Sequence, residues 1–481
     1  MHSGSYDHEH WSSRLAFIMA AVGAAVGLGN LWRFPYEAGA NGGGAFVLVY
    51  MICVLLIGLP VLAAELFIGR RGALSAVGSV SKLARDEGRS PAWAALSWIG
   101  MIGAFLILTF YSVIAGWVIA YVVMFVGDFF AQVGASGPAA LAGGAFASET
   151  PGAVSARLGE LLGDPGRMTF YHSIFMVITV LIVARGLKGG IETAVQVMMP
   201  AFFFMLLVLV GYSFAAGDIG RAANFLLFDF EITALMDGEV ILSALGQAFF
   251  SIGLGAALMI TYGAYMTKDV NIPRASGIIA VADTLVALIA GFAIFPIVFA
   301  VGLDPAAGPT LLFESLPLAF QSMPFGLVFG LVFFVLAFFA ALTSSISLLE
   351  IAASWLEEQT DMPRALLVSI LGGIAFIVGL GSVFSMNIWS AVKPISFIPL
   401  FEGKTIFDIL DVLTGQVLLP LSGFLTAVFA GWVVSERAAA EELGFKSETY
   451  FKAWRFSVRY ICPVAVGAVL VYGALIAPLL D

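Results

Sequence analysis

Long apolar runs, separated by short polar stretches, follow one another along almost the whole chain. A helix needs about 20 mainly apolar residues to cross the hydrocarbon core of a bilayer. On this criterion we expect eleven membrane-spanning helices, near residues 15–36, 45–68, 94–126, 168–184, 192–216, 241–266, 276–302, 323–356, 365–389, 409–435 and 458–480. The segment 127–167 is too polar and too rich in Gly and Ala to span, so we expect it to be an external loop.

The composition agrees with this pattern and excludes the soluble classes of protein. Hydrophobic residues make up 60% of the 481-residue chain and charged residues 11%, whereas a soluble domain has about 45–50% and about 25%. A soluble enzyme and a nucleic-acid-binding protein are therefore excluded. For a membrane enzyme, the sequence lacks an HExxH motif and a Cys pair, and its four His lie near the N-terminus or alone. We expect a non-enzymatic protein of the lipid bilayer, with no obligate protein partner evident.

Positively charged residues predict the orientation, because Lys and Arg are enriched in cytoplasmic loops. The N-terminal MHSGSYDHEH lacks the features of a signal peptide, so the first apolar run should remain in the mature protein. With the N-terminus in the cytoplasm, 16 of the 22 Lys and Arg fall on the inner side. The other six are Arg33, Arg157, Arg167, Arg221, Lys393 and Lys404. We therefore expect a multi-pass inner-membrane protein with its N-terminus inside and its C-terminus outside.

Two of the expected spans carry residues that do not suit an unbroken helix in lipid. The first reads LAFIMAAVGAAVGLGNLWRFP and the sixth SALGQAFFSIGLGAALMITYGAY, each with several glycines at mid-span. Glycine weakens a helix by about 1 kcal/mol relative to alanine, and backbone groups freed at this depth must line a cavity or be buried in protein. Such glycines can also be seams at which helices pack closely. Because the two runs lie five spans apart, in corresponding positions, we favour a pair of discontinuous helices.

Two broken helices at this spacing are typical of an inverted repeat. Spans one to five (about 12–216) and six to ten (about 240–435) would be the two repeats. The span at about 458–480 would be an extra helix of the same transporter domain, which covers residues 1–481. Exposed N-termini of half-helices bind anions, whereas unwound carbonyl groups suit a hard cation such as Na⁺. This arrangement predicts ion-coupled transport of a small molecule.

The glycine-rich first span closely resembles one transporter family. The stretch AVGAAVGLGNLWRFPYEAGANGGGAF, together with FFSIGLG and LTSSIS, is similar to the neurotransmitter:sodium symporters, and the resemblance runs through ten of the eleven spans. It implies an all-α fold of the leucine-transporter type, which is a 5+5 inverted repeat with discontinuous helices 1 and 6. It also implies sodium-driven symport by alternating access. Eleven spans in place of twelve are typical of the shorter, bacterial branch of the family.

The resemblance implies two sodium sites built only from oxygen ligands, which suit a hard cation. The first would use Ala25, Asn30, Ser251 and Asp283. The second would use Gly23, Val26, Ala340, Thr343 and Ser344. A Ser/Thr pair alone could also serve hydrogen bonding between helices, but its place opposite the broken first helix favours an ion site.

Asp283 is the most informative single residue. A carboxylate at this depth costs about 2.5–3.5 kcal/mol on insertion scales, so it needs a cationic partner. Many members of the family have Asn at this position and gain the negative charge from chloride or from an acid one turn later, where this chain has Ala287. We therefore expect sodium dependence without chloride dependence. The alternative is a protonated Asp283 that is hydrogen-bonded within the helix bundle.

The substrate site is also implied by the resemblance. The N–H groups of Leu28 and Gly29 and the hydroxyl of Tyr111 would hold a carboxylate. Gly27 stands where transporters of biogenic amines have Asp, which favours an amino acid as substrate. The remaining lining would be Ala24, Ala25, Ile107, Phe250, Ser251, Gly253, Ala256, Ser344 and Leu348.

Small residues in this lining predict a wide pocket. Gly253 and Ala256 are smaller than their family counterparts, so a neutral amino acid with a hydrophobic or aromatic side chain would fit. Ala24 removes a polar group, and Asp283 lessens the need for a substrate carboxylate, so an uncharged aromatic solute such as indole is the alternative. A channel would need a continuous pore, usually ringed by identical groups from several chains. A transport-inactive sensor is the remaining alternative.

Two gates are implied in the same way. Arg33 and Asp411 would form the outer ion pair above Tyr111 and Phe250, although such an Arg could also snorkel to the interface. The inner gate would consist of His8, Trp11, Tyr265 and Glu358. Because an ordinary imidazole is mostly neutral at pH 7, His8 would pair strongly with Glu358 only in acid.

The fifth span begins with GIETAVQVMMP, in which Gly190 and Pro200 bracket nine residues. Neither residue suits a helix interior. In the family this spacing lets the cytoplasmic end unwind and admit water to the second sodium site, whereas the alternative is a simple helix start. Glu65, in the second span, is expected to accept hydrogen bonds from the unwound part of the sixth span.

Overall fold

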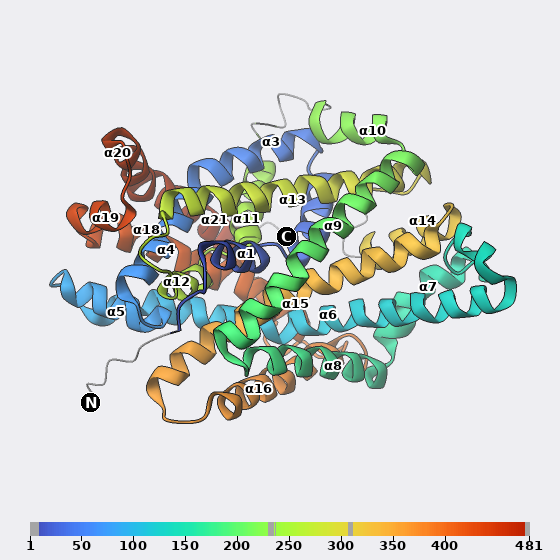
Figure 1. Ribbon diagram of the computed structural model, residues 1–481, viewed down its shortest axis with the longest axis horizontal. Helices are drawn as coiled ribbons and strands as arrows, with labels where there is room; N and C mark the ends of the chain where they lie inside the picture. The colour runs from blue at the N-terminus through green and yellow to red at the C-terminus, as the bar shows by residue number, and fades with distance from the viewer. Residues whose placement is uncertain (1–8, 229–234, 236, 306–310, 477–481) are drawn as a thin grey trace.

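The computed structural model describes residues 9–228, 235, 237–305 and 311–476. Every regular element within those ranges is a helix. The long helices run side by side along the longest axis of the molecule (Figure 1). The described part of the chain therefore has the all-α architecture that the sequence predicts.

Among the described residues, nine helices are long and apolar enough to cross a membrane, and a bent pair forms a tenth span. The continuous spans are Gly44–Gly72 (α3, Gly44–Cys53, and α4, Leu59–Gly72), Pro91–Ala142 (mainly α6, Ala95–Ser136), Pro165–Val183 (α8), Leu187–Ala216 (mainly α9, Thr193–Ala216), Ile272–Ala300 (α13), Gly326–Gln359 (α15), Arg364–Ser385 (α16), Ile406–Val433 (α17, Ile406–Val412, and α18, Leu419–Val428) and Glu448–Ile476 (α20, Glu448–Phe456, and α21, Cys462–Val471). The bent pair is Arg14–Ala25 (α1) with Gly29–Ala40, which ends in α2 (Phe34–Ala40). The remaining expected span is divided into α11 (Gly238–Ile252) and α12 (Leu258–Ala264).

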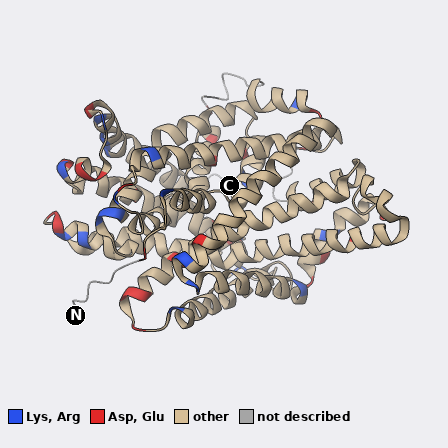
Figure 2. Ribbon diagram, in the orientation of Figure 1, with Lys and Arg blue, Asp and Glu red and all other residues tan. Residues whose placement is uncertain are grey.

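Shorter helices lie between these spans. They are α5 (Ala76–Asp86), α7 (Pro151–Gly163), α10 (Ile219–Ala223), α14 (Leu316–Ser322) and α19 (Glu436–Leu443). Charged residues gather around α5, α19 and α20 at one end of the molecule, whereas the shafts of the long helices carry few (Figure 2). This distribution fits helices whose middle sections face hydrocarbon, where a charge is costly.

The first span is broken at its glycines, as predicted. α1 ends at Ala25, Val26 is extended with φ −73° and ψ 104°, and the second half of the span runs at 49° to the first. A methyl group on Gly27 would lie 2.6 Å from Ser344 Oγ. Glycine is therefore needed for the close approach of this unwound turn to α15.

The sixth span is broken more widely, over residues 253–257. Gly253 and Gly255 have φ of +71° and +77°, and Ala257 has φ +60°, conformations that disfavour a side chain. A methyl group on Gly255 would lie 2.2 Å from the carbonyl oxygen of Leu419. The N–H of Gly255 donates to Glu65 Oε1 at 2.8 Å. The prediction that Glu65 supports this unwound segment is confirmed.

The expected external loop at 127–167 is largely helical, which corrects the sequence prediction. α6 continues to Ser136 and is 42 residues long, and α7 occupies Pro151–Gly163. The helix α6 stops only at Gly137, whose φ is +68°. The residues after Gly127 are too polar for lipid but do not stop a helix, so the limit of the hydrocarbon and the limit of the helix fall at different positions.

The last span also begins earlier than predicted, at Glu448 instead of residue 458. Its first helix, α20, has the sequence ETYFKAWRF, in which Phe451 and Trp454 are buried while the charged side chains lie on other faces. Polar residues at the start of this helix hide its beginning from a search for continuous apolar runs. The predicted end at residue 480 lies outside the described residues.

Candidate functional site

A buried polar cluster joins the two broken spans to α13. The side-chain amide of Asn30 donates hydrogen bonds to Ser251 Oγ at 3.0 Å and to Asp283 Oδ1 at 2.8 Å. Ser251 Oγ donates to Asp283 Oδ2 at 2.8 Å, and the hydroxyl of Tyr50 donates to the same oxygen at 3.5 Å. Asn30 and Asp283 are fully buried. Three of the residues predicted for the first sodium site are thus in contact, although 221 positions separate Asn30 from Ser251.

The chemistry of this cluster fits a monovalent hard cation. It combines the carboxylate of Asp283 with the hydroxyl of Ser251, and Asn30 turns its amide N–H groups toward both. Ala25, the fourth predicted ligand, is the last residue of α1, where a helix has carbonyl groups without intrahelical partners. The amide oxygen of Asn30 accepts the N–H of Gly27 at 3.0 Å, which holds the unwound turn in place. No group of three or more His, Cys, Asp or Glu that could bind a metal occurs among the described residues. One carboxylate balances the charge of one Na⁺.

The residues predicted for the second sodium site lie where α1 meets α15. Ser344 Oγ donates to the carbonyl oxygen of Ala24 at 3.4 Å, and a methyl group on Gly23 would lie 3.6 Å from Thr343 Cβ. Val26 follows the end of α1, and Ala340 is buried on α15. The hydroxyl of Thr343 donates to the carbonyls of Phe339 and Ala340, each at 3.1 Å. Both hydroxyls are therefore close to the unwound first span, as an ion site there requires.

A cavity of about 70 Å³ lies between the two broken spans. About 10–15 Å³ suffices for one water molecule, so the cavity has room for several. It is lined by Ala24, Ala25, Gly27, Gly29, Ile107, Tyr111, Phe250, Ser251, Gly253, Ala256, Leu258, Ser344, Leu348 and Leu419. Of the predicted lining, only Leu28 is absent from this set, and its N–H donates to the hydroxyl of Tyr111 at 3.3 Å.

Two lining residues were missed by the sequence reasoning. Leu258 directly follows the break in the sixth span, and Leu419 belongs to α18. The close approach of Gly255 to the backbone of Leu419 brings α18 to the cavity. The glycines of FFSIGLG indicate that some backbone lies close by, but they do not indicate which helix supplies it.

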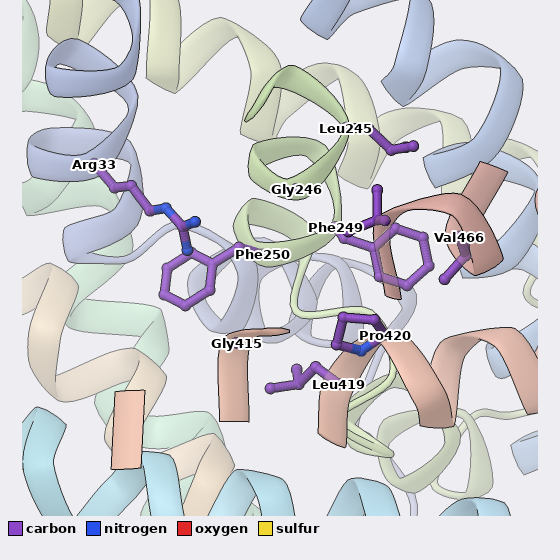
Figure 3. A pocket seen from close by; sticks show the side chains of 10 residues that line it. Arg33, Leu245, Gly246, Phe249, Phe250, Gly415, Leu419, Pro420 and Val466 are labelled. Carbon is purple, nitrogen blue, oxygen red and sulfur yellow. The ribbon is translucent and has the colours of Figure 1, made fainter. Parts of the chain in front are cut away.

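On the predicted outer side, Arg33 lies over Phe250. Its Cζ is 4.6 Å from the centre of the Phe250 ring, and its Nε is 3.5 Å from Glu37 Oε1. Among the described residues Arg33 forms no ion pair with Asp411, so the predicted outer pair is absent from this conformation. A second, smaller cavity beside Arg33 shares Phe250 and Leu419 with the cavity between the broken spans (Figure 3). The Phe250 ring therefore stands at the boundary between the two cavities.

On the predicted inner side, Trp11 ties the N-terminal segment to α12. Its backbone N–H donates to the carbonyl of Tyr265 at 3.1 Å, and its indole N–H donates to the carbonyl of Tyr262 at 3.2 Å. Glu358 accepts hydrogen bonds from the backbone and the hydroxyl of Ser75. His8, the partner predicted for Glu358, lies outside the described residues. Trp11 and Tyr265 are thus in contact, whereas Glu358 binds to the start of α5.

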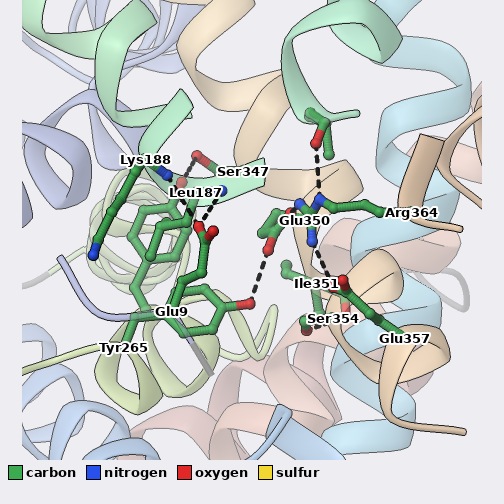
Figure 4. A network of polar contacts seen from close by, with 12 residues as sticks. Glu9, Leu187, Lys188, Tyr265, Ser347, Glu350, Ile351, Ser354, Glu357 and Arg364 are labelled. Carbon is green, nitrogen blue, oxygen red and sulfur yellow. Dashed lines mark hydrogen bonds and ion pairs between the residues drawn. The ribbon is translucent and has the colours of Figure 1, made fainter. Parts of the chain in front are cut away.

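A carboxylate that the sequence reasoning missed stands at the centre of this inner side. Glu350 on α15 accepts a hydrogen bond from the hydroxyl of Tyr265 at 2.8 Å and forms an ion pair with Arg364 (Figure 4). Arg364 also pairs with Glu357 at 2.6 Å and donates to the carbonyl of Val183 at 3.1 Å. The guanidinium of Arg364 and its partners therefore connect α8, the end of α12, α15 and α16.

Arg364→Gln should weaken the network of ion pairs and hydrogen bonds around Glu350. Glu350 is 1% exposed and would become a buried charge without a cationic partner. We expect the free energy of unfolding to fall by about 2 kcal/mol, less than for a fully buried pair because Arg364 retains 17% exposure. Thermal unfolding of purified protein measures this change. Arg437→Gln is the matched control, since Arg437 pairs with Glu441 on the surface; equal effects of the two variants would contradict the expectation.

Gly190 lies in the first turns of the fifth span and Pro200 lies inside α9, and the span is helical throughout residues 187–216. A methyl group on Gly190 would lie 2.0 Å from the carbonyl oxygen of Ile182, so this glycine is needed for a tight connection to α8. Met199, just before Pro200, would lie 2.9 Å (Sδ) from a methyl group on Gly23. The unwinding of this segment stays a prediction. Because Met199 lies against Gly23, unwinding of the segment would expose α1 at Gly23.

Comparison with known proteins adds three findings. The model of the sodium:neurotransmitter symporter family matches residues 8–130 and 154–477. An uncharacterized sodium-dependent transporter of Bacillus subtilis is 37% identical over 461 residues, which is 95% of each chain, and one of Haemophilus influenzae is 33% identical over 97% of this chain and 98% of its own. The crystal structure of MhsT in complex with L-phenylalanine has a TM-score of 0.84 and 38% identity, and covers 97% of this chain and 100% of that one.

Proposed function

Because the chain belongs to the sodium:neurotransmitter symporter family and is a sodium-dependent membrane transporter, not an enzyme, we propose that it imports a small neutral amino acid with a hydrophobic or aromatic side chain. The amino acid would move together with Na⁺, held at two sites, by alternating access and without chloride. The observation that carries this proposal is the buried carboxylate of Asp283, which lies within hydrogen-bond distance of Asn30 and Ser251 at the junction of the two broken spans.

Sodium coupling follows from the charge of this cluster. A carboxylate buried in a membrane protein needs a cationic partner, and no Lys or Arg contacts Asp283 among the described residues. Bound Na⁺ would neutralise it and would bridge α1, α11 and α13. Because Asp283 itself carries the negative charge, no chloride ion is needed to balance the cation. Thr343 and Ser344 of α15 would hold the second Na⁺ against the end of α1.

The substrate proposal rests on the lining of the cavity. The start of the second half of the first span presents backbone N–H groups at Leu28 and Gly29 beside the hydroxyl of Tyr111, a place that suits a carboxylate. Among the described residues no atom lies within 4 Å of a methyl group placed on Gly253, and Ala256 is small. MhsT, in complex with L-phenylalanine, is a structural relative over nearly the whole chain, which supports an aromatic amino acid.

We further propose that the transporter lies in the bacterial inner membrane with its N-terminus in the cytoplasm and its C-terminus outside. The end of the molecule that carries α5, α19 and α20 is rich in Lys and Arg (Figure 2), and positively charged ends stay in the cytoplasm. In this orientation the Glu350–Arg364 network closes the cytoplasmic side, and Phe250 with Tyr111 covers the substrate from outside. Alternating access would open these two sides in turn.

Uptake into proteoliposomes tests the proposal. An inward Na⁺ gradient should drive saturable uptake of L-phenylalanine. Replacing chloride with gluconate should not lower this uptake, whereas replacing sodium with choline should remove the gradient-driven uptake. Preloading with unlabelled substrate should stimulate uptake by exchange, which a channel cannot show. A requirement for chloride, or the absence of any flux, would contradict the proposal.

Indole is the second candidate substrate. The pocket has alanine at position 24, and Asp283 supplies the charge that a substrate carboxylate would otherwise add at the first sodium. Sodium-driven indole uptake in the same liposomes, without uptake of L-phenylalanine or L-leucine, would favour indole over the amino acid.

A further inference from the structure

Two carboxylates connect the N-terminal segment to the cytoplasmic start of the fifth span. Glu9 reaches from the N-terminal segment and accepts the backbone N–H groups of Leu187 at 3.0 Å and Lys188 at 3.2 Å (Figure 4). These N–H groups belong to the first turn of the span, where a helix has donors without intrahelical partners. Glu9 therefore caps the fifth span from another part of the chain.

Glu192 makes the reverse connection. Its Oε2 accepts the backbone N–H of Ser12 at 3.1 Å, and its Oε1 accepts the Ser12 hydroxyl. Ser12 directly precedes Ser13, the N-cap of α1. Glu192 is 5% exposed, and Gln196 Nε2 also donates to it, at 3.0 Å. A buried carboxylate of the fifth span thus binds the start of α1.

Glu9 therefore places a negative charge at the start of the fifth span, and Glu192 places one beside the residue that precedes the N-cap of α1. A carboxylate at a helix N-terminus is stabilised by the exposed N–H groups and by the helix dipole, and hydrogen bonds to a charged acceptor are stronger than neutral ones. In ordinary capping the acid belongs to the helix that it caps and moves with it. Here both carboxylate contacts are lost when the two helix starts move apart, so separation of α1 from the fifth span costs two charged contacts at once.

The clasp, defined here as Glu9 with Leu187 and Lys188 and Glu192 with Ser12, lies on the same side of α9 as a deeper contact with α1. Met199 is two helical turns beyond Glu192, on the same face of the helix, and it packs against Gly23. Gly23 is a predicted ligand of the second sodium site. The fifth span therefore contacts α1 at the cytoplasmic surface through the clasp and beside the second sodium site through Met199.

We propose that Glu9 and Glu192 are positioning residues for sodium release. They couple the N-terminal half of the first span to the start of the fifth span, so that the second sodium site opens to the cytoplasm only when both helix starts part together. This inference rests on the proposed function, because it needs Na⁺ to bind between α1 and α15. Neither carboxylate touches Na⁺ or substrate; each acts through the helix that it holds.

Hydrogen–deuterium exchange of the full-length protein tests the coupling. NaCl is titrated against choline chloride at constant ionic strength, and exchange is followed in the peptides that cover residues 14–25 and 187–199. In the wild type, Na⁺ should slow exchange in both peptides with one midpoint. In Glu9→Gln and in Glu192→Gln, both peptides should exchange faster, and the Na⁺ midpoint should rise about fivefold.

The double variant and a control sharpen the result. If the two contacts act as one unit, Glu9→Gln with Glu192→Gln should raise the midpoint by no more than about twofold beyond either single variant, because residues of one network are not additive. Glu441→Gln makes the same change in charge on α19, away from the clasp, and should leave the midpoint unchanged. Glu9 is exposed, so its variant tests the proposal even if Glu192→Gln fails to fold.

Two outcomes would overturn the coupling. The first is a lower melting temperature with an unchanged Na⁺ midpoint, which is what a merely structural contact gives. The second is faster exchange in one peptide without the other. If Na⁺ does not slow exchange in the wild type at all, the proposed sodium symport fails, and the coupling fails with it.

Discussion

Asp283→Asn should reduce sodium-driven uptake in chloride-free medium at least about 100-fold. The substitution keeps the size of the side chain but removes the charge that would balance Na⁺ in a site where Asn30 and Asp283 are fully buried. An uncompensated buried charge costs about 3 kcal/mol or more, which corresponds to a loss of that order. Initial rates of L-phenylalanine uptake in sodium gluconate, as a function of sodium concentration, measure the effect.

Chloride should partly restore this variant. The hydroxyls of Tyr50 and Ser251 both donate to Asp283 Oδ2 in the wild type, and both could turn to an anion once that oxygen carries no charge. We expect chloride to raise uptake by Asp283→Asn about tenfold over the chloride-free rate, because it returns one compensating charge. Asp361→Asn, an identical change at an exposed position, is the control. If Asp283→Asn in chloride-free medium had the same sodium dependence of uptake as the wild type, the carboxylate would not be the group that balances the cation.

The backbone breaks could be predicted because their cause is local. Glycines at mid-span in the first and sixth helices mark the positions where the chain leaves helical geometry, and Gly253 and Gly255 do adopt left-handed φ angles there. The polar cluster was implied by the resemblance to the symporter family. Its physical basis is that Asn30, Ser251 and Asp283 are polar residues in apolar runs and have few partners at that depth except one another.

Contacts between side chains of distant segments could not be predicted in the same way. The guanidinium of Arg364 pairs with Glu350, yet both residues read as ordinary charged positions near the end of a span. Glu9 binds backbone N–H groups, and Glu192 binds the backbone N–H of Ser12 in addition to its hydroxyl; backbone partners leave no complementary residue type in the sequence. Leu419 reaches the cavity because Gly255 packs on its backbone, and no pattern within α18 reports that approach.

The sequence also did not predict how far the helices extend into the loops, and the reason is physical. Hydropathy reports where lipid ends, whereas a helix ends where a residue such as Gly137 leaves helical φ. The end of α6, up to Ser136, and the start of α20, from Glu448, are helical but lie beyond the apolar runs. Predictions that depended on the membrane depth of a residue were therefore sounder than those that depended on where a helix stops.

Gly27→Ala should weaken substrate binding strongly. The added methyl group would lie 2.6 Å from Ser344 Oγ and 3.3 Å from the hydroxyl of Tyr111, two groups that line the cavity. A cavity of about 70 Å³ leaves little room to relieve this contact, and overpacking costs about 1–3 kcal/mol. We expect the affinity for L-phenylalanine, measured by sodium-dependent binding to purified protein, to fall about 100-fold. Gly127→Ala adds the same methyl group on α6 where nothing lies within 4 Å, so it should bind as the wild type does; comparable binding by both variants would place the substrate elsewhere.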